Sequence, residues 1–377
     1  MKTTPSRNEI KDWLTDLYGR SGAAALSPLE RVTRTIDHLP TDRLPFDFWG
    51  VPEVIERLVD YLDVKDEQEM LRLLGVDCRV VWPRYSGPEL PRFEDGSYLD
   101  PWGFHRKIIK NNFSMYEEYA SYPLSKAANP GEVEKWEAWE TARLWDWQAV
   151  RGQIDALNSS ATYHIRYEVG GIFEFAWAVY GLERFVVDLV RRPAVPRAIL
   201  EGYTDVFIEN VRNLLDAAGD RIDMLYTYDD IASQNNLLIS PQLWREYILP
   251  CHQRLNQVIK RYGKKIMYHS CGSIYRLIPA LIEEMHIDVL NPLQPRAKDM
   301  DMSRIKREFG GKLAFHGGVD LQYTLPFGTV QEVQDEVRQR CQVLGEGGGY
   351  ICTSAHYLQN DIPTENIIAL YTTSREV

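Results

Sequence analysis

The sequence has no uninterrupted apolar run of roughly 18 residues, so it predicts no transmembrane helix. Its first residues, MKTTPSRNEIKDWL, contain no apolar stretch of the kind found in a signal peptide. Basic residues are also in deficit, because 43 Lys and Arg stand against 54 Asp and Glu, which gives a net charge of −11. This balance argues against a large nucleic-acid-binding surface. We therefore expect a cytoplasmic protein without a membrane or nucleic-acid partner.

Cysteine is scarce. The five cysteines among 377 residues are scattered at Cys78, Cys251, Cys271, Cys341 and Cys352. In a chain without an export signal we expect them to be thiols in a reducing cytosol. A functional cysteine would then be a metal ligand or a nucleophile. The motifs GxSxG, HExxH and the P-loop are absent from the chain.

Short β-branched or aromatic runs alternate with amphipathic stretches of helical period. This alternation is typical of a parallel sheet covered by helices, and eight such units fit a (β/α)₈ barrel. A doubly wound open sheet is the alternative, but no GxGxxG follows a strand. The eight predicted strands are 44–49, 77–82, 163–168, 222–228, 264–269, 287–291, 312–316 and 349–353.

Two segments fall outside this alternation. Residues 1–40 indicate a polar, helical N-terminal extension. Residues 84–160 indicate an aromatic-rich insertion that covers the barrel mouth within one domain, 1–377. Trp136, Trp139, Trp145 and Trp147 follow at near-helical spacing. They favour a helical insertion packed on the body, with an aromatic wall over a pocket as the alternative.

Polar residues follow most of the predicted strands, where the active face of such a barrel lies. The fifth strand ends in IMYHSCGS, so His269 and Cys271 share one face at a spacing of about 6.6 Å along the strand. Imidazole and thiolate are ligands that zinc favours. Alone, the pair is more typical of a protein core. His356 and Cys352 on the last strand and Asp229 after the fourth could complete a site.

Three other segments supply polar candidates. Asp229 and Asp230 are adjacent, so one can line the pocket while the other caps a helix or loop, and Gln234 can add a neutral hydrogen bond. Asn291 follows the sixth strand and His316 the seventh. Glu174 is expected to be solvated. Cys251–His252 is discounted as a metal pair, because adjacent residues of a helix diverge.

At this point three segments show a family likeness: HSCGSIYRLIPALIEEMHIDVLNPLQP, FHGGVD and GGGYICTSAHYLQNDIPTENI. They resemble the uroporphyrinogen decarboxylase superfamily, closest to the branch of zinc- and corrinoid-dependent methyltransferases. The resemblance covers most of 28–377 and implies a (β/α)₈ barrel. It also implies zinc held by His269, Cys271 and a third ligand at His356, with Asp229 either as a fourth ligand or as a partner that supports the ligands.

The resemblance has two departures. The arginine-rich first-strand segment of true uroporphyrinogen decarboxylases is replaced by FDFWGVPEVIERL, which argues against tetrapyrrole decarboxylation. The thiol methyltransferases carry cysteine where this chain has His356. A second histidine would leave more positive charge on zinc and a stronger Lewis acid, which favours an ether or amine methyl donor over a thiol acceptor.

The expected function is therefore transfer of a methyl group between a small methylated substrate and the corrinoid of a partner protein. Asp229 and His316 are the expected catalytic residues. An aryl methyl ether would suit the aromatic residues that are expected to shape the pocket, namely Trp49, Tyr85, Trp102 and Phe173. The alternatives are a metal-free decarboxylase or lyase using Asp229, His316 and His356, and a non-catalytic ligand- or corrinoid-binding barrel. The family often forms homodimers.

Overall fold

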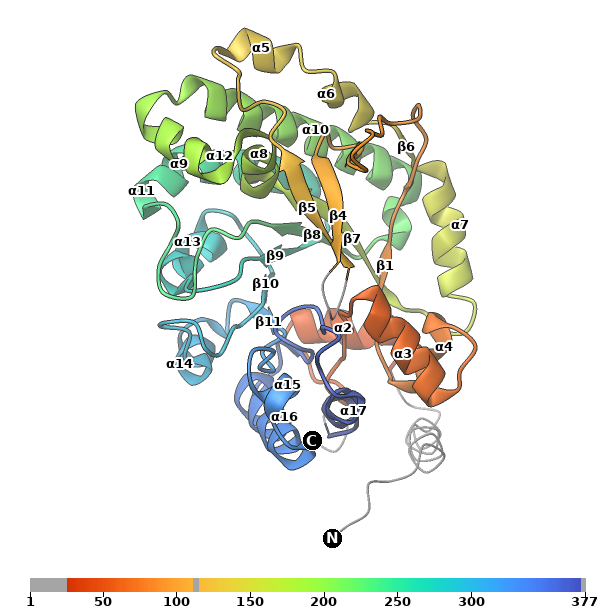
Figure 1. Cartoon of the computed structure of the whole chain (residues 1–377). Coiled ribbons are helices and arrows are strands. Elements are labelled where there is room, and N and C mark those ends of the chain that lie inside the picture. The colour runs from red at the N-terminus through yellow and green to blue at the C-terminus, as the bar shows by residue number, and fades with distance from the viewer. Residues whose placement is uncertain (1–25, 111–114, 374–377) are drawn as a thin grey trace. The chain divides into compact units, whose positions relative to one another are not determined.

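The computed structural model describes residues 26–110 and 115–373, which form two compact units. The first unit contains the described residues up to Arg79, 157–164 and the chain from Val289 onward, and the second contains Val80–Ala156 and Ile165–Asp288. Most of the predicted N-terminal extension lies outside the described residues. Its described part includes α2 (Pro28–Ile36) (Figure 1).

The second unit holds the second half of β1 and most or all of β7, β8 and β9, which follow one another in this order in the main sheet. β7 pairs in parallel with β8, and β8 with β9, so that Gly171 lies opposite Tyr228 and Tyr228 opposite His269. The strands thus end together, and the residues that follow them can meet. Their bounds are Cys78–Val81 for β1, His164–Gly171 for β7, Met224–Tyr228 for β8 and Lys265–His269 for β9.

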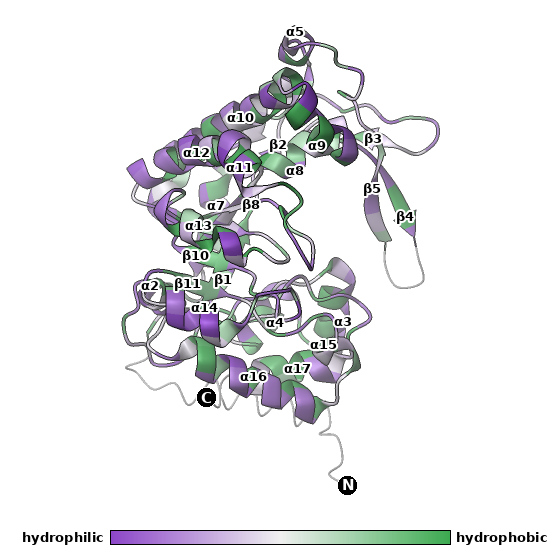
Figure 2. Ribbon diagram, turned by 90° about the vertical axis from the view of Figure 1, so that its left-hand side faces the viewer, coloured by the Kyte–Doolittle hydropathy of each residue, from purple (hydrophilic) through white to green (hydrophobic). Residues whose placement is uncertain are grey.

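Helices cover these strands, and α12 alternates hydrophilic and hydrophobic residues as a helix with one buried face should (Figure 2). A π-helical turn, η2 (Trp244–Ile248), runs directly into α12 (Leu249–Arg261). The other helices of this unit are α7 (Gln148–Leu157), α8 (Ile172–Tyr180), α9 (Leu182–Arg191), α10 (Ala194–Ala218), η1 (Gly219–Arg221), α11 (Pro241–Leu243), η3 (Tyr275–Leu277) and α13 (Ile278–Glu283).

The insertion is less helical than expected. Its described residues hold an antiparallel pair, β2 with β6, and a three-stranded sheet, β3-β4-β5, besides α7 and two short helices. Trp139 still packs against Tyr203 of α10, with ring centroids 4.9 Å apart, so part of the tryptophan stripe does pack on the body of this unit. The bounds are Arg84–Tyr85 (β2), Tyr98–Leu99 (β3), His105–Lys110 (β4), Met115–Ser121 (β5), Pro130–Glu134 (α5), Ala138–Thr141 (α6) and Trp145–Asp146 (β6).

The first unit holds the other three strands of the main sheet, β10 (Val289–Asn291), β11 (Ala314–His316) and β12 (Tyr350–Ile351), in parallel pairs. The predicted first strand, 44–49, makes one isolated bridge, Phe46 with Cys352, and Gly50 just after it makes another, with Leu358. Carboxylates interrupt its ladder, because the N–H of Phe46 donates to Asp77 and that of Phe48 to Asp47. Seven of the eight predicted strands are therefore present in the described residues.

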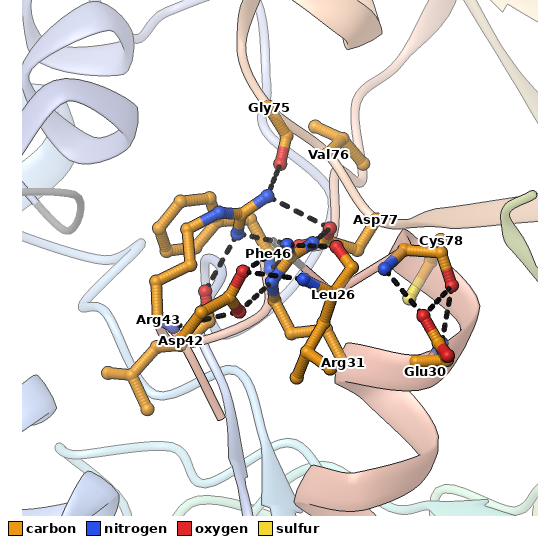
Figure 3. A network of polar contacts seen from close by, with 12 residues as sticks. Leu26, Glu30, Arg31, Asp42, Arg43, Phe46, Gly75, Val76, Asp77 and Cys78 are labelled. Carbon is orange, nitrogen blue, oxygen red and sulfur yellow. Dashed lines mark hydrogen bonds and ion pairs between the residues drawn. The ribbon is translucent and has the colours of Figure 1, made fainter. Parts of the chain in front are cut away.

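A buried ion network fixes the start of the first unit (Figure 3). Asp77 is fully buried and accepts hydrogen bonds from Arg31, at 2.5 Å, and from Arg43, at 2.8 and 2.9 Å. Arg31 in turn binds both oxygens of Asp42. The remaining helices are α3 (Pro52–Leu62), α4 (Glu67–Leu73), α14 (Met302–Phe309), α15 (Thr324–Phe327), α16 (Val330–Gly345) and α17 (Thr364–Thr373).

None of the helices in these described ranges combines the length and the apolar character that a membrane span requires.

Candidate functional site

His269 and Cys271 come together at the end of β9. His269 Nε2 lies 3.4 Å from Cys271 Sγ, and Cys271 is half-buried. The turn depends on Gly272, whose φ of +85° favours glycine and whose missing Cβ would stand 2.4 Å from the carbonyl oxygen of Ser233. Glycine therefore lets the chain reverse closely enough for the two side chains to share a face.

Asp230 is the carboxylate beside this pair. Its Oδ1 accepts the N–H of Cys271 at 2.7 Å and lies 3.4 Å from His269 Nε2. Burial alone would lower the pKa of His269, but hydrogen bonds to Asp230 and Cys271 outweigh it and hold that pKa well above its usual value. Burial raises the pKa of the Cys271 thiol.

The distances from His269 Nε2 to the sulfur and to the carboxylate oxygen are those expected of two ligands of one metal ion. With ordinary zinc–ligand distances, a tetrahedral site needs about 3.6 Å between N and S and about 3.3 Å between N and O. The observed distances from His269 Nε2 are both 3.4 Å. The N···O distance is long for a charge-assisted hydrogen bond, which is typically about 2.7–2.9 Å. Nitrogen, sulfur and carboxylate oxygen are all donor types that zinc accepts.

Asp229 has a different environment from Asp230. It is completely buried, its Oδ2 lies 2.5 Å from His252 Nε2, and its Oδ1 accepts the N–H of Glu174 at 3.0 Å. Burial raises the pKa of Asp229, while His252 opposes this shift. Of the two adjacent aspartates, Asp229 is thus the one that binds a helix end, and Asp230 is the one beside His269.

Glu174 bridges the two aspartates. Its Oε1 accepts the N–H of Asp230 at 2.7 Å while its own N–H donates to Asp229. Burial, followed by the charges of Asp230 and Asp229, raises the pKa of Glu174 to about 8. Burial likewise raises the pKa of Glu168, on β7, to about 7. The expectation that Glu174 is solvated was wrong, because it sits at the first turn of α8 against the end of β8.

His316 lies in a separate network within the first unit. Its Nε2 is 2.8 Å from Asp47 Oδ2 and its Nδ1 is 2.6 Å from Asn291 Nδ2, so both ring nitrogens are bound. Trp49 donates its indole N–H to the same Asp47 oxygen at 2.9 Å. All four side chains are at most 4% exposed. His316, Asn291 and Trp49, predicted from separate strands, therefore meet around a carboxylate that sequence reasoning did not single out.

The last strand gives its two candidate ligands different environments. His356 follows β12, is half-buried, and has its ring centroid 5.6 Å from that of Tyr357. Cys352 is 1% exposed, and its backbone N–H and carbonyl bind Pro45 and Asp47. His356 is thus the more accessible donor of the two.

The predicted aromatic residues fall into two groups. Tyr85 and Trp102 both contact Trp145, with centroids 5.7 and 5.1 Å apart, and stay half-buried in the second unit. Phe173 is fully buried against Phe185 of α9. Gln234 is half-buried in the loop after β8. Tyr85 and Trp102 can line a surface, whereas Phe173 contributes to the core.

Sequence reasoning missed His252, Asp47 and the function of Glu174. Cys251–His252 was discounted as a metal pair because adjacent helix residues diverge, and a hydrogen bond of His252 alone was not considered, yet its ring reaches Asp229 from α12. An available signal was the acidic pair after β8, since a buried carboxylate needs a partner. For Asp47 the signal was an acidic residue inside an otherwise apolar run, LPFDFW.

Comparison with known proteins places the chain in a family. Residues 127–377 match the family described as uroporphyrinogen decarboxylase (URO-D), and the chain belongs to that family. It is 26% identical over 204 residues to a methylated-thiol–coenzyme M methyltransferase of Methanosarcina mazei, a match that spans 54% of this chain and about half (51%) of that relative's length.

A solved structure extends the likeness in fold. A methyltransferase from Methanosarcina mazei superimposes with a TM-score of 0.65, covering 93% of this chain and 99% of that one, at 16% sequence identity. Together with the parallel strands and covering helices, this establishes an α/β fold like that of the family's barrels.

Proposed function

We propose that this protein is a zinc-dependent methyltransferase that moves a methyl group between a small methylated substrate and a corrinoid carried by a partner protein. The single observation that carries the proposal is the His269–Cys271 pair with Asp230, spaced as zinc ligands are. Two relatives named as methyltransferases support the reaction type. The same proposal includes the family's (β/α)₈ barrel, closed by eight strands as one domain. It also includes a homodimeric assembly and a cytoplasmic location. The location is supported by five cysteines, all within the described residues, that form no disulfide.

The proposed ligands are His269, Cys271 and His356, whose imidazole and thiolate donors are types that zinc favours. Asp230 would take the place that the sequence suggested for Asp229, since both oxygens of Asp229 are already bound by His252 and the first turn of α8. Asp229 would then act through the protein instead of touching the metal. Bound zinc would supply a Lewis acid for the substrate heteroatom that carries the methyl group.

The chain's own side chains would prepare this chemistry. Asp230 fixes the orientation of the Cys271 turn through the Cys271 N–H and faces the His269 ring. Glu174 holds the Asp230 backbone, so the carboxylate has little freedom to turn away. His316 is proposed as a catalytic residue whose buried ring is fixed at both nitrogens by Asp47 and Asn291.

The substrate class proposed is an aryl methyl ether. Tyr85, Trp102 and Trp145 offer half-buried aromatic rings in one cluster, which suits an aromatic substrate better than an aliphatic amine. The histidine at position 356, in place of a second cysteine, favours a donor whose leaving oxygen needs polarisation. Gln234 is proposed to supply a hydrogen bond to the substrate.

The test is the zinc content of the purified protein, followed by methyl transfer to cob(I)alamin from a panel of aryl methyl ethers, methylamines and methylated thiols. We expect about one zinc per chain, lost in His269→Ala and Cys271→Ala and kept in Cys251→Ala, which removes a buried thiol of α12. A protein that binds no zinc and decarboxylates a carboxylated substrate would overturn the proposal. Zinc binding without transfer from any donor would favour the binding-protein alternative.

A further inference from the structure

His252 and Asp229 form a hydrogen-bonded pair with no exposure to solvent. Both side chains are 0% exposed, and the N···O distance is 2.5 Å. Burial of such a pair carries a desolvation cost, so it does not by itself stabilise the fold. The other ring nitrogen of His252, Nδ1, is buried and finds no hydrogen-bond partner among the described residues. Asp229 is therefore the hydrogen-bond partner that orients the ring, which also packs edge-on against Tyr268 with ring centroids 5.3 Å apart.

Asp229 serves as the N-terminal cap of α8 from outside that helix. The residue at the N-cap position is Gly171, which has no side chain to accept the first helical N–H groups. Asp229 accepts the N–H of Phe173 and of Glu174, the second and third residues of the helix. A charged cap of this kind satisfies the orphan donors and interacts favourably with the helix dipole.

Glu174 makes the reciprocal hydrogen bond of this cap. In an ordinary capping box the third helical residue binds the backbone of the N-cap residue. Here the Glu174 carboxylate binds the N–H of Asp230, the residue next to the cap, at 2.7 Å. The carboxylate of Asp230 then binds the N–H of Cys271 and lies beside His269. A continuous series of hydrogen bonds thus leads from His252 to the metal-ligating pair.

We propose that His252 is a positioning residue that holds the proposed zinc ligands in place through Asp229, Glu174 and Asp230. The inference rests on the proposed function insofar as the ion is zinc. The positioning itself is a property of the protein chain. Loss of the His252–Asp229 contact frees the cap of α8, and Glu174 then no longer fixes the backbone of Asp230. Partners of metal ligands typically contribute about 10–100-fold in metal affinity.

Two substitutions of similar polarity separate positioning from packing. In His252→Gln the amide nitrogen reaches about the position of Nε2, so the bond to Asp229 is kept. In His252→Asn the amide stops near Nδ1, so the bond is lost although a polar side chain remains. Cys251→Ala, one residue away on α12, controls for disturbance of the helix, since its thiol contacts the Tyr247 carbonyl at 3.4 Å.

The first readout is zinc affinity, measured by competition with a chromogenic chelator. We expect His252→Asn to bind zinc about 10–100-fold more weakly than the unmodified protein, while His252→Gln and Cys251→Ala retain most of the affinity. Equal affinities in His252→Asn and His252→Gln would overturn the inference.

The second readout needs no metal. Cys271 is the half-buried cysteine, and the other four are buried, so alkylation of the metal-free protein by iodoacetamide followed by peptide mass reports on Cys271. His252→Asn should raise the alkylation rate several-fold, and His252→Gln should not. If the unmodified protein binds no zinc, the proposed function fails. The alkylation rate of Cys271 still shows whether His252 acts as a positioning residue. An unchanged alkylation rate in His252→Asn would overturn the inference about His252. A rise in Cys251→Ala equal to that in His252→Asn would overturn it as well.

Discussion

Replacing Asp223 by asparagine should make the stability of the protein less dependent on pH. Asp223 precedes β8 and accepts the N–H of Ile165, on β7, at 2.7 Å. Burial raises the pKa of its carboxyl group to about 6, against partial opposition from the Ile165 N–H and from Lys264. The carboxylate therefore joins two strands at their amino ends, but its charge is disfavoured where it lies.

The direction in which stability changes with pH follows from proton binding. Because the folded state holds the Asp223 proton more tightly than the unfolded chain does, stability is lost as pH rises from about 4 to about 6. A shift of roughly two pKa units corresponds to about 3 kcal/mol, about half of which is lost above pH 5. Asparagine keeps an oxygen for the Ile165 N–H and has no proton to lose. Asp223→Asn should therefore gain about 1.5 kcal/mol relative to the unmodified protein between pH 5 and pH 8.

The assay is urea unfolding of both proteins at pH 5, 6, 7 and 8, with free energies taken by linear extrapolation. Asp220→Asn is a suitable control. Asp220 is exposed and its pKa is lowered by its hydrogen bond to Arg151, so it does not titrate in this window. The free-energy difference should rise with pH for Asp223→Asn and stay level for Asp220→Asn. A level difference for both, or a fall for Asp223→Asn, would refute the reasoning.

Three further substitutions test local packing within the two units. Asp77→Ala leaves two arginines without their shared buried carboxylate and should cost about 3–5 kcal/mol in urea unfolding. A loss of unfolding free energy smaller than about 1 kcal/mol would show that water takes the place of the Asp77 carboxylate. Gly272→Ala should lower both the melting temperature and the zinc content, because the added Cβ would strike a carbonyl oxygen. Gly311→Ala is the control and should change neither, because a Cβ there meets nothing within 4 Å. Trp102→Ala should cost about 3 kcal/mol by removing contacts to three aromatic rings, and Trp82→Ala, 52% exposed, should cost far less. Similar losses for the two tryptophans would contradict the proposed aromatic cluster.

The alternation of strands and helices could be predicted because it depends on local periodicity. Seven predicted strands are present within a few residues of their expected ends. The remaining predicted strand, 44–49, is not confirmed as a regular strand, because the N–H groups of Phe46 and Phe48 bind carboxylates and its pairing is limited to isolated bridges. The hairpin β4–β5 was missed because its polar and aromatic residues give little apolar alternation.

The site was predictable in part, for a different reason. His269 and Cys271 are close in sequence, and a strand followed by glycine places them together. The choice between Asp229 and Asp230 could not be made from sequence, because it depends on which carboxylate meets α8 and His252. Those partners lie 55 and 23 residues away along the chain. Only the folded arrangement brings them near.

The π-helical turn η2 bears on how the chain can change in length. A π-turn holds one residue more than an α-turn, and each residue of an α-helix advances the side chains by about 100°. Deleting one residue within Trp244–Ile248 would remove the extra residue and leave α12 in its present orientation, whereas deleting one residue of α12 ahead of His252 would turn His252 by about 100° relative to the preceding helix. His252 would then leave its place opposite Asp229 without having been substituted. The pairing is specified by the number of residues that precede it as well as by the two residues themselves.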